Sequence, residues 1–393
     1  MKITKILAMM FLTGAVAFSS CKKDKDDPIA IPPPPSNSIA VSSNITASTT
    51  WTTGKIYVLR GRIAVEDGVT LTIQPGVIVK GQAGTGANAS ALLVARGGKL
   101  MAEGTAAQPI IFTAEADAIQ PGQIISPNLD PAINGLWGGV IICGKAKISA
   151  SNSTGDVSEV QIEGIPTSDA NGLYGGSDDM DNSGTLKYIS IRHGGTNIGA
   201  GNEINGLTFG GVGSGTVVEN IEVVANQDDG YEWFGGTVNV TNAISWNVGD
   251  DGFDTDQAWS GTLDNFYSIT PSGHMFELDG PEGSMSGSHT IKNGTAICSD
   301  ADVTSEDLIN VDDNTEVSLS NIHFTDVQTG QKINRVTAAL VSFSGITINV
   351  PQDSLASHVN GTVPAGVTAG GSSAANKAAF AGWSWADAAG VLK

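Results

Sequence analysis

The sequence predicts an all-β protein, a parallel β-helix in which each turn of the chain adds one coil. Two observations support this fold. Short β-branched, apolar runs alternate with Gly, Asn and Asp, and similar segments recur at a period in the twenties. No amphipathic helix is visible between residues 40 and 350. Such a repeat indicates a solenoid in which each strand pairs with the equivalent strand of the next coil.

The clearest repeat is a Gly-Thr-apolar segment. It begins at Gly215, Gly236 and Gly261, and a looser copy begins at Gly184. Asparagines follow at spacings of 22, 23, 28 and 28 residues, namely Asn220, Asn242, Asn265, Asn293 and Asn321. Because asparagine suits turns, we expect these side chains to have a structural role, either bonding to nearby backbone or stacking on the asparagine of the next coil.

The N-terminal half carries a resemblance to a known group of proteins. The segments are Val65–Gly81 (VEDGVTLTIQPGVIVKG), Leu92–Thr113 and Gly135–Val140 (GLWGGV). They resemble bacterial surface β-helix proteins of pectate-lyase-like architecture, over about residues 45 to 350. The resemblance implies a right-handed parallel β-helix with three faces. It implies no single activity, because lyases, hydrolases and adhesins share this fold.

The chain divides into four predicted segments. Residues 1–20 are a signal peptide, 21–37 a tether, 38–350 the β-helix of about 13 coils, and 351–393 a C-terminal cap or tail. A solenoid has open ends, so we expect caps over them. Candidates are residues 38–60, with Trp51, and residues 374–393, whose Phe380, Trp383 and Trp385 are expected to be core rather than sugar-stacking residues.

The first residues have the pattern of a lipoprotein signal peptide. Lys2 and Lys5 precede an apolar stretch, which ends in Ser19-Ser20-Cys21. This pattern is a lipobox, and it predicts cleavage before Cys21 and acylation of that cysteine. The alternative is an ordinary signal peptide with an incidental cysteine. A stretch of about 13 apolar residues is too short to span a bilayer, so no transmembrane helix is expected.

A charged and proline-rich tether follows Cys21. Residues 22–27 read KKDKDD, and residues 32–35 are prolines. The charged run resembles the export signal of Bacteroidetes-type surface lipoproteins. That resemblance implies a protein anchored in the outer membrane through the lipid on Cys21 and facing the cell exterior. An anchor facing the periplasm is the alternative.

Charge and cysteine content limit the partners. The formal net charge is -20, and removing residues 1–20 makes it more negative by two. Nucleic acid is therefore an unsuitable partner. Cys143 and Cys298 lie in apolar runs several coils apart, and at about 4.8 Å per coil they are too distant for a disulfide. We expect both to be buried free thiols.

Residues 226–280, here called the acidic coils, carry ionisable side chains at equivalent positions of successive repeats. Residues 228–232 (DDGYE) align with 250–254 (DDGFD) and with 273–277 (GHMFE). The alignment stacks Tyr231, Phe253 and Phe276 as an inward aromatic ladder. Strand alternation then points the neighbouring carboxylates outward. They are Glu232, Asp254 and Glu277, joined two residues later by Asp256 and Asp279.

Stacked carboxylates repel by about 1 kcal/mol per pair in water, and solvent, raised pKa values or a cation must offset this repulsion. Calcium suits an oxygen-only cluster. The candidate calcium ligands are Asp228, Glu232, Asp250, Asp254, Asp256, Glu277 and Asp279. The alternative is a structural turn pattern in which aspartates cap backbone amides.

The catalytic candidates are Asp229, Asp251, Asp254 and His274. Glycoside hydrolysis needs two carboxylates on either side of the scissile bond, which Asp229, Asp250, Asp251 and Asp254 could supply. Lyases of this fold use a basic residue instead, and Arg192 and His193 are the nearest in sequence. No polysaccharidase signature is complete.

Three functions therefore remain open. The first is a non-enzymatic surface lipoprotein whose acidic β-helix binds glycan or another envelope component. The alternative is a calcium-dependent polysaccharide lyase or glycoside hydrolase that uses residues 228–279. The third is a structural envelope protein without a small ligand.

Overall fold

The computed structural model describes residues 35–198, 203–334 and 340–393. The expected signal peptide, the acylated Cys21 and the tether as far as residue 34 lie outside these ranges and stay predictions. Among the described residues, no helix is long and apolar enough to cross a membrane.

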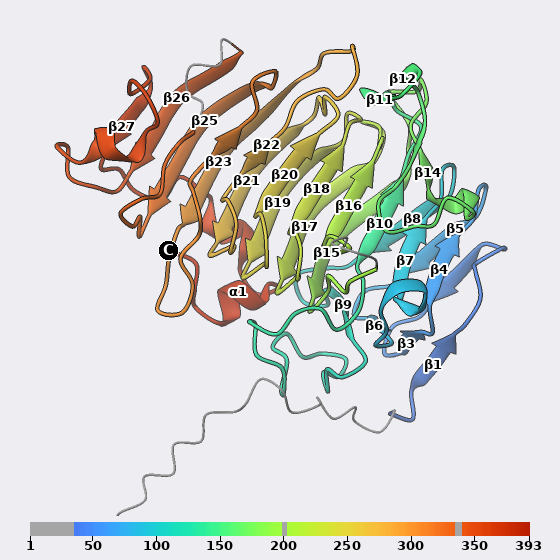
Figure 1. Cartoon of the computed structure of the whole chain (residues 1–393). Coiled ribbons are helices and arrows are strands. Elements are labelled where there is room, and N and C mark those ends of the chain that lie inside the picture. The colour runs from blue at the N-terminus through green and yellow to red at the C-terminus, as the bar shows by residue number, and fades with distance from the viewer. Residues whose placement is uncertain (1–34, 199–202, 335–339) are drawn as a thin grey trace, which may run out of the picture. The chain divides into compact units, whose positions relative to one another are not determined.

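One face of the fold is an eight-stranded parallel sheet, here called sheet B (Figure 1). Each of its strands comes from a successive coil and pairs in parallel with the next. In chain order the strands are β4 (Arg62–Val65), β7 (Ala91–Val94), β10 (Val140–Cys143), β16 (Leu207–Gly210), β18 (Tyr231–Phe234), β20 (Phe253–Asp256), β22 (Glu277–Leu278) and β24 (Asn310–Val311).

The other two faces form sheet A, which has fifteen strands. Its main path is β1 (Ser38–Val41), β3 (Ile56–Leu59), β6 (Ile78–Gly81), β9 (Ile110–Ala114), β15 (Gly184–Arg192), β17 (Val217–Val224), β19 (Asn239–Trp246), β21 (Thr262–Ile269), β23 (Ser288–Ile297), β25 (Glu316–Thr325), β26 (Val341–Ile348) and β27 (Val367–Ala369). These twelve strands, one per coil within the described residues, compare with the 13 or so coils expected. A side branch holds β2 (Thr49–Trp51), β5 (Thr70–Ile73) and β8 (Lys99–Glu103).

Sheet A is two faces joined by a bend. β8 pairs with Gly184–Lys187, the first half of β15, and β9 pairs with residues 189–191 of its second half. Between the halves, Tyr188 has a φ of 51°, which turns the strand. From β15 onward each long strand therefore serves two faces, and sheet B supplies the third. The chain folds as a right-handed parallel β-helix with three faces, as predicted.

The repeated asparagines occupy the bends of the long strands. Asn220, Asn242, Asn265, Asn293 and Asn321 all have φ values between 51° and 60°. Asparagine tolerates this left-handed conformation better than most residues. The Nδ2 of Asn242 donates to Oδ1 of Asn220 at 2.9 Å, and Asn265 donates to Asn242 at 2.6 Å. Nδ2 of Asn321 likewise donates to Asn293, but Asn293 donates to Oδ1 of Asp264. The expected ladder is therefore confirmed except for a break between Asn265 and Asn293.

The interior holds the expected aromatic ladder. The ring centroids of Tyr231 and Phe253 lie 5.1 Å apart, and those of Phe253 and Phe276 lie 5.9 Å apart, both pairs stacked. Cys143 and Cys298 are buried and free, as predicted. The same core of stacked apolar side chains runs through the coils from Ile45 to Val367.

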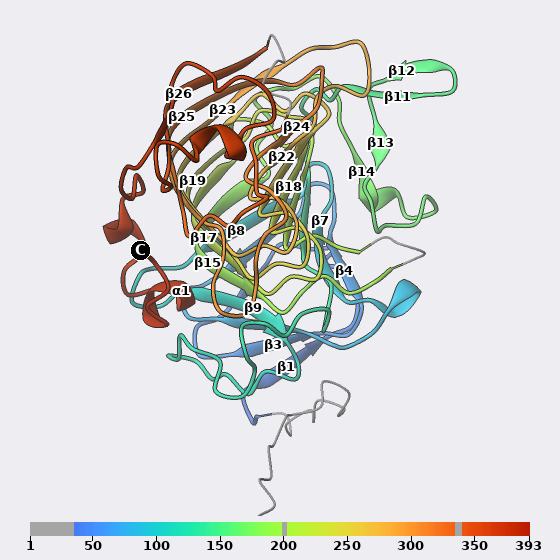
Figure 2. The same cartoon turned by 60° about the vertical axis from the view of Figure 1, so that its left-hand side comes forward.

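An insertion after β10 covers part of sheet B. It contains β11 (Ala150–Asn152), β12 (Gly155–Val157), β13 (Val160–Gln161) and β14 (Leu173–Tyr174). In both views the β11–β12 hairpin projects away from the stack (Figures 1 and 2). Ile148, Ile162 and Tyr174 pack on outward side chains of β7 and β10 and on Phe234 of β18. The acidic residues lie on the same outer face of sheet B, on β18, β20 and β22.

The C-terminal residues 374–393, here called the strap, lie along the outer face of sheet A rather than over an open end. The strap contains α1 (Trp385–Ala388), beside β15 and β17 in Figure 1. Its Phe380 packs on Tyr267 of β21, with ring centroids 5.4 Å apart, and its Trp385 packs on Trp246 of β19 at 5.8 Å. Phe380, Trp383 and Trp385 are buried, as expected of core residues.

Strand stacking extends past residue 350, because β27 pairs in parallel with β26. At the other end, the ring of Trp51 stacks on Tyr57 at 4.6 Å and belongs to the first coil. The remaining helical segments are single 3₁₀ turns: η1 (Gly86–Asn88), η2 (Ala170–Gly172), η3 (Leu355–His358) and η4 (Lys377–Phe380).

Candidate functional site

Two columns of polar side chains cross the outer face of sheet B. The strand column lies on the strands themselves, where the β-ladder places equivalent residues side by side. Each residue of the turn column lies three positions before the strand-column residue of the same coil. The strand column is Thr208, Glu232, Asp254, Glu277 and Asn310, and the turn column is Asn205, Asp229, Asp251, His274 and Asp307. Stacking at β-sheet spacing forces these groups together whatever their charge.

The columns bring most of the predicted residues into three groups, each with ligand atoms within 4.8 Å of one another. We call Asp228, Asp229 and Asp250 the outer trio, and Asp229, Glu232 and Asp254 the inner trio. The histidine trio is Asp251, His274 and Glu277. Asp256 and Asp279 of the predicted calcium set belong to none of these groups, although both are part-buried nearby.

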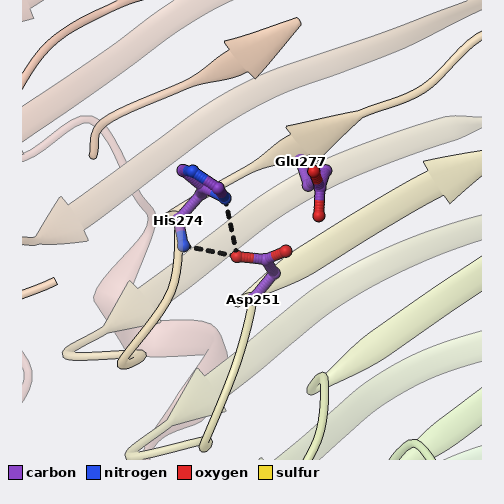
Figure 3. Close-up of side chains that lie close together, drawn as sticks. All are labelled: Asp251, His274 and Glu277. Carbon is purple, nitrogen blue, oxygen red and sulfur yellow. Dashed lines mark hydrogen bonds and ion pairs between the residues drawn. The ribbon is translucent and has the colours of Figure 1, made fainter. Parts of the chain in front are cut away.

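The histidine trio is shown in Figure 3. Nδ1 of His274 lies 3.0 Å from Oδ1 of Asp251, which also accepts the backbone N–H of His274. Burial lowers the pKa of His274, but the hydrogen bond and charge of Asp251 outweigh it and raise the pKa to about 9. The hydrogen bond with Asp251, followed by burial, raises the pKa of Glu277 to about 8. At neutral pH the trio therefore holds an ionised His274, an ionised Asp251 and a protonated Glu277.

The inner trio is the more buried of the two acidic groups. Asp229 and Glu232 are each 7% exposed. Burial, followed by the neighbouring carboxylates, raises the pKa of Asp229, Glu232 and Asp254 well above their usual range. In the outer trio, burial and the charge of Asp250 raise the pKa of Asp228 to about 7. Ionising all these groups together requires a cation or a set of hydrogen-bond donors.

Arg192 and His193 lie elsewhere, so the interpretation of either as a lyase base beside the acidic coils is wrong. Both are fully buried beneath the strap. The guanidinium carbon of Arg192 lies 4.8 Å from the ring centroid of Trp385, and the His193 ring is 5.7 Å from the same residue. The chain bends at His193, with φ 59°, just after β15. The two residues are close to the acidic coils in sequence, but they lie at the end of a strand of sheet A.

Two amides at the site escaped the sequence interpretation. The side chain of Asn205 donates to Oε2 of Glu232, and Nδ2 of Asn310 donates to Oε1 of Glu277 at 3.2 Å. Extending the alignment by one coil, so that Leu207 matches Tyr231, places Asn205 opposite Asp229. Asn310 lies in a two-residue strand after a long connection, which leaves little pattern to align.

Calcium fits the outer trio by the chemistry of its donors. All three side chains are carboxylates, and Asp250 is exposed, so that water can complete a shell of six to eight oxygens. The histidine trio is a poorer fit, because calcium prefers oxygen to imidazole nitrogen.

A family model described as a pectate-lyase like beta helix domain matches residues 43–384. The chain belongs to this family. No curated protein and no solved structure matches it. A pectate-lyase-like β-helix suggests a carbohydrate-related role, and is compatible with a polysaccharide lyase or hydrolase if the protein is an enzyme.

Proposed function

We propose that this pectate-lyase-like β-helix is a lipid-anchored protein of the bacterial outer membrane that binds carbohydrate at the cell surface. The observation that supports carbohydrate binding is the pair of acidic columns on sheet B. They form a row of acceptors on one face, next to the covering insertion. Carboxylates and amides are the groups that accept hydrogen bonds from sugar hydroxyls. The net charge of -20 opposes binding to anionic polymers.

The anchor is proposed from the sequence alone. Cys21 follows Ser19-Ser20, and a charged run follows it. We expect the protein to incorporate a labelled fatty acid and to be digested by a protease added to intact cells. Cys21→Ser should abolish labelling while leaving the β-helix folded. Labelling of the Cys21→Ser protein, or protection from the protease in intact cells, would contradict the anchor or its orientation.

Carbohydrate binding is tested with the full chain in mild detergent, by calorimetry against neutral glycans, amino-sugar glycans and polyuronates. We expect at least one class to bind, and Asp254→Asn to weaken binding. Asp353→Asn is the matched control, because it removes the same charge from an exposed residue outside the columns. Absence of binding by every class would overturn the proposal.

The second candidate is a calcium-dependent polysaccharide lyase or glycoside hydrolase. The observation that favours it is the histidine trio, where a charged His274 and a protonated Glu277 flank Asp251. Glu277 would donate a proton to a leaving oxygen. Asp254, its neighbour in the strand column on the adjacent coil, would supply the second carboxylate that glycoside hydrolysis needs. Calcium held by the outer trio would neutralise a uronate carboxylate.

The two candidates differ in turnover. Product release from a polysaccharide, lost in both Glu277→Gln and Asp254→Asn, would establish the enzyme and contradict a binding-only protein. Under the leading proposal, neither added calcium nor EDTA produces or removes any turnover. A shift of the melting temperature by calcium, absent in Asp250→Asn, would assign the ion to the outer trio independently of activity.

A further inference from the structure

The inner trio has a feature that its acidity alone does not explain. The carboxylates of Asp229, Glu232 and Asp254 lie within 4.8 Å of one another. Within the described residues, no lysine or arginine forms an ion pair with any of them. The electrostatic neighbours that act on Glu232 and Asp254 are all carboxylates. No lysine or arginine among the described residues therefore offsets the charge that these carboxylates would carry when ionised.

A buried amide beside the trio points to a missing partner. Asn205 is only 3% exposed, and its Nδ2 is directed at Glu232. Its Oδ1 is buried and accepts no hydrogen bond from the described residues, and the same is true of Oδ1 of Asp254. Buried acceptors are normally satisfied. An unsatisfied amide oxygen beside three carboxylates, one of which also has an unsatisfied oxygen, indicates that the natural occupant is a donor with positive charge.

We propose that the inner trio and Asn205 form the seat for a primary ammonium group of an amino-sugar glycan. An ammonium has three N–H donors, which are shared among the three carboxylates and the unsatisfied Oδ1 of Asn205. With contacts of about 2.8 Å and tetrahedral angles, its acceptors lie about 4.6 Å apart. The carboxylate oxygens of the trio lie within 4.8 Å of one another, which is compatible with this spacing. The proposal rests on the proposed carbohydrate binding and names its ligand class.

The surroundings suit a sugar ring attached to that ammonium. Asp229 is shared with the outer trio, so the part-buried Asp228 and the exposed Asp250 lie next to the seat and offer acceptors to ring hydroxyls. A uronate would place one more carboxylate among these groups, and repulsion between like charges would oppose it. The site therefore selects amino sugars over polyuronates.

The test compares a tetramer of β-1,4-linked glucosamine with its fully N-acetylated form, by calorimetry on the full chain in detergent at pH 6. Acetylation removes the charge and leaves the ring. We expect the free amine to bind at least about tenfold more tightly, since hydrogen bonds between charged groups contribute more than neutral ones. Glu232→Gln and Asp254→Asn should each remove this preference, and Asp353→Asn should keep it.

A second kind of variant is expected to raise the affinity for the amine rather than lower it. Asn205→Asp adds a fourth carboxylate and should strengthen the binding of the amine, which guards against misreading a loss caused by misfolding. Spermidine separates the amino sugar from a bare polyamine: weaker binding by spermidine than by the tetramer is expected, and equal or tighter binding would overturn the sugar assignment.

The remaining outcomes separate the two proposals. Equal affinity for the amine and its acetylated form overturns the ammonium seat but leaves carbohydrate binding standing. Binding of neither tetramer, nor of any other glycan, overturns both. Calcium binding that Glu232→Gln abolishes, without any preference for the amine, makes the trio a metal site and overturns the ammonium assignment.

Discussion

Glu222 and Glu232 are both buried glutamates, and each points outward from one of the two sheets. The carboxylate of Glu222, on sheet A, accepts the backbone N–H groups of Trp385 and Ala386 in the strap, at 3.0 and 2.8 Å. It also accepts the hydroxyl of Ser190. Glu232, on sheet B, accepts a hydrogen bond from Asn205 but faces the carboxylates of Asp229 and Asp254.

The difference teaches that identical strand stacking can produce a closed face and an open one. On sheet A the strap supplies donors and an aromatic cover, so the carboxylate of Glu222 is satisfied by the chain itself, although Nη1 and Nη2 of Arg192 and Nε2 of His193 have no hydrogen-bond partner among the described residues. On sheet B no comparable donor set meets the inner trio within the described residues. A buried cluster without hydrogen-bond donors lowers the stability of the fold. Such clusters are found at catalytic and ligand-binding sites.

The largest expected effect is at Glu222. Glu222→Gln keeps the shape but removes the charge that holds the first turn of α1 and lies 3.9 Å from the buried Arg192. Breaking one partner of a buried ion pair costs roughly 3–5 kcal/mol. We expect the free energy of unfolding in urea to fall by that amount, and proteases to cleave the strap first.

Glu219→Gln is the matched control on the same strand. Its side chain is 43% exposed and pairs with Lys187 at 3.1 Å, an arrangement worth less than about 1 kcal/mol. Equal losses in the two variants would mean that the strap does not depend on Glu222, and the contrast between the sheets would lose its basis.

The next effect concerns the bend that divides sheet A into two faces. Asn242 has a φ of 59° and bonds to Asn220 and Asn265. Asn242→Ala should cost about 2 kcal/mol, from lost hydrogen bonds and from the strain of alanine at positive φ. Asn242→Gly should cost about half as much, because glycine adopts this conformation freely. Similar losses for both variants would show that strain at the bend is unimportant.

The sequence predicted the fold because its signal is periodic. Strand pairing every twenty-odd residues repeats the same apolar and asparagine positions, so Asn220 and Asn242 could be aligned without any structure. The strap could not be placed in this way. It is not a repeat, and its contact with Glu222 joins residues 163 positions apart in the chain, a pairing that no local pattern encodes.

The candidate site was predicted in part for the same reason. Asp229, Asp251 and His274 follow the repeat, and the structure stacks them. Asn205 lies in an irregular loop before β16, where the repeat is interrupted. Arg192 and His193 were candidates on proximity in sequence alone, which says little about which of the three faces a residue serves. Burial, which raises the pKa values of the inner trio, is also invisible in the sequence.

The smallest expected effect is the dependence of stability on pH, and it tests sheet B directly. The pKa of Glu277 is raised to about 8 and that of Asp228 to about 7, from 4.5 and 3.8. Between the unfolded and folded values, the folded protein retains protons that the unfolded chain has released. Its stability should therefore fall as the pH rises from about 4.5 to 8. The raised pKa of His274 acts in the same direction between 6.5 and about 9. Burial lowers the pKa of His193 to about 4 and that of His289 to about 3, so these two groups oppose the fall below about 6.5 but not above it.

We expect the melting temperature to be lower at pH 8 than at pH 7, a range in which the buried histidines no longer contribute, and Glu232→Gln to reduce the difference. Removing one of the repelling charges should stabilise the protein by roughly 1 kcal/mol at pH 8, opposite in sign to Glu222→Gln. The pH dependence of the Glu222→Gln protein should keep its slope, because Glu222 lies on the other sheet. A melting temperature that rises over this range, or a loss of stability in Glu232→Gln, would mean that the inner trio is satisfied within the chain, as Glu222 is.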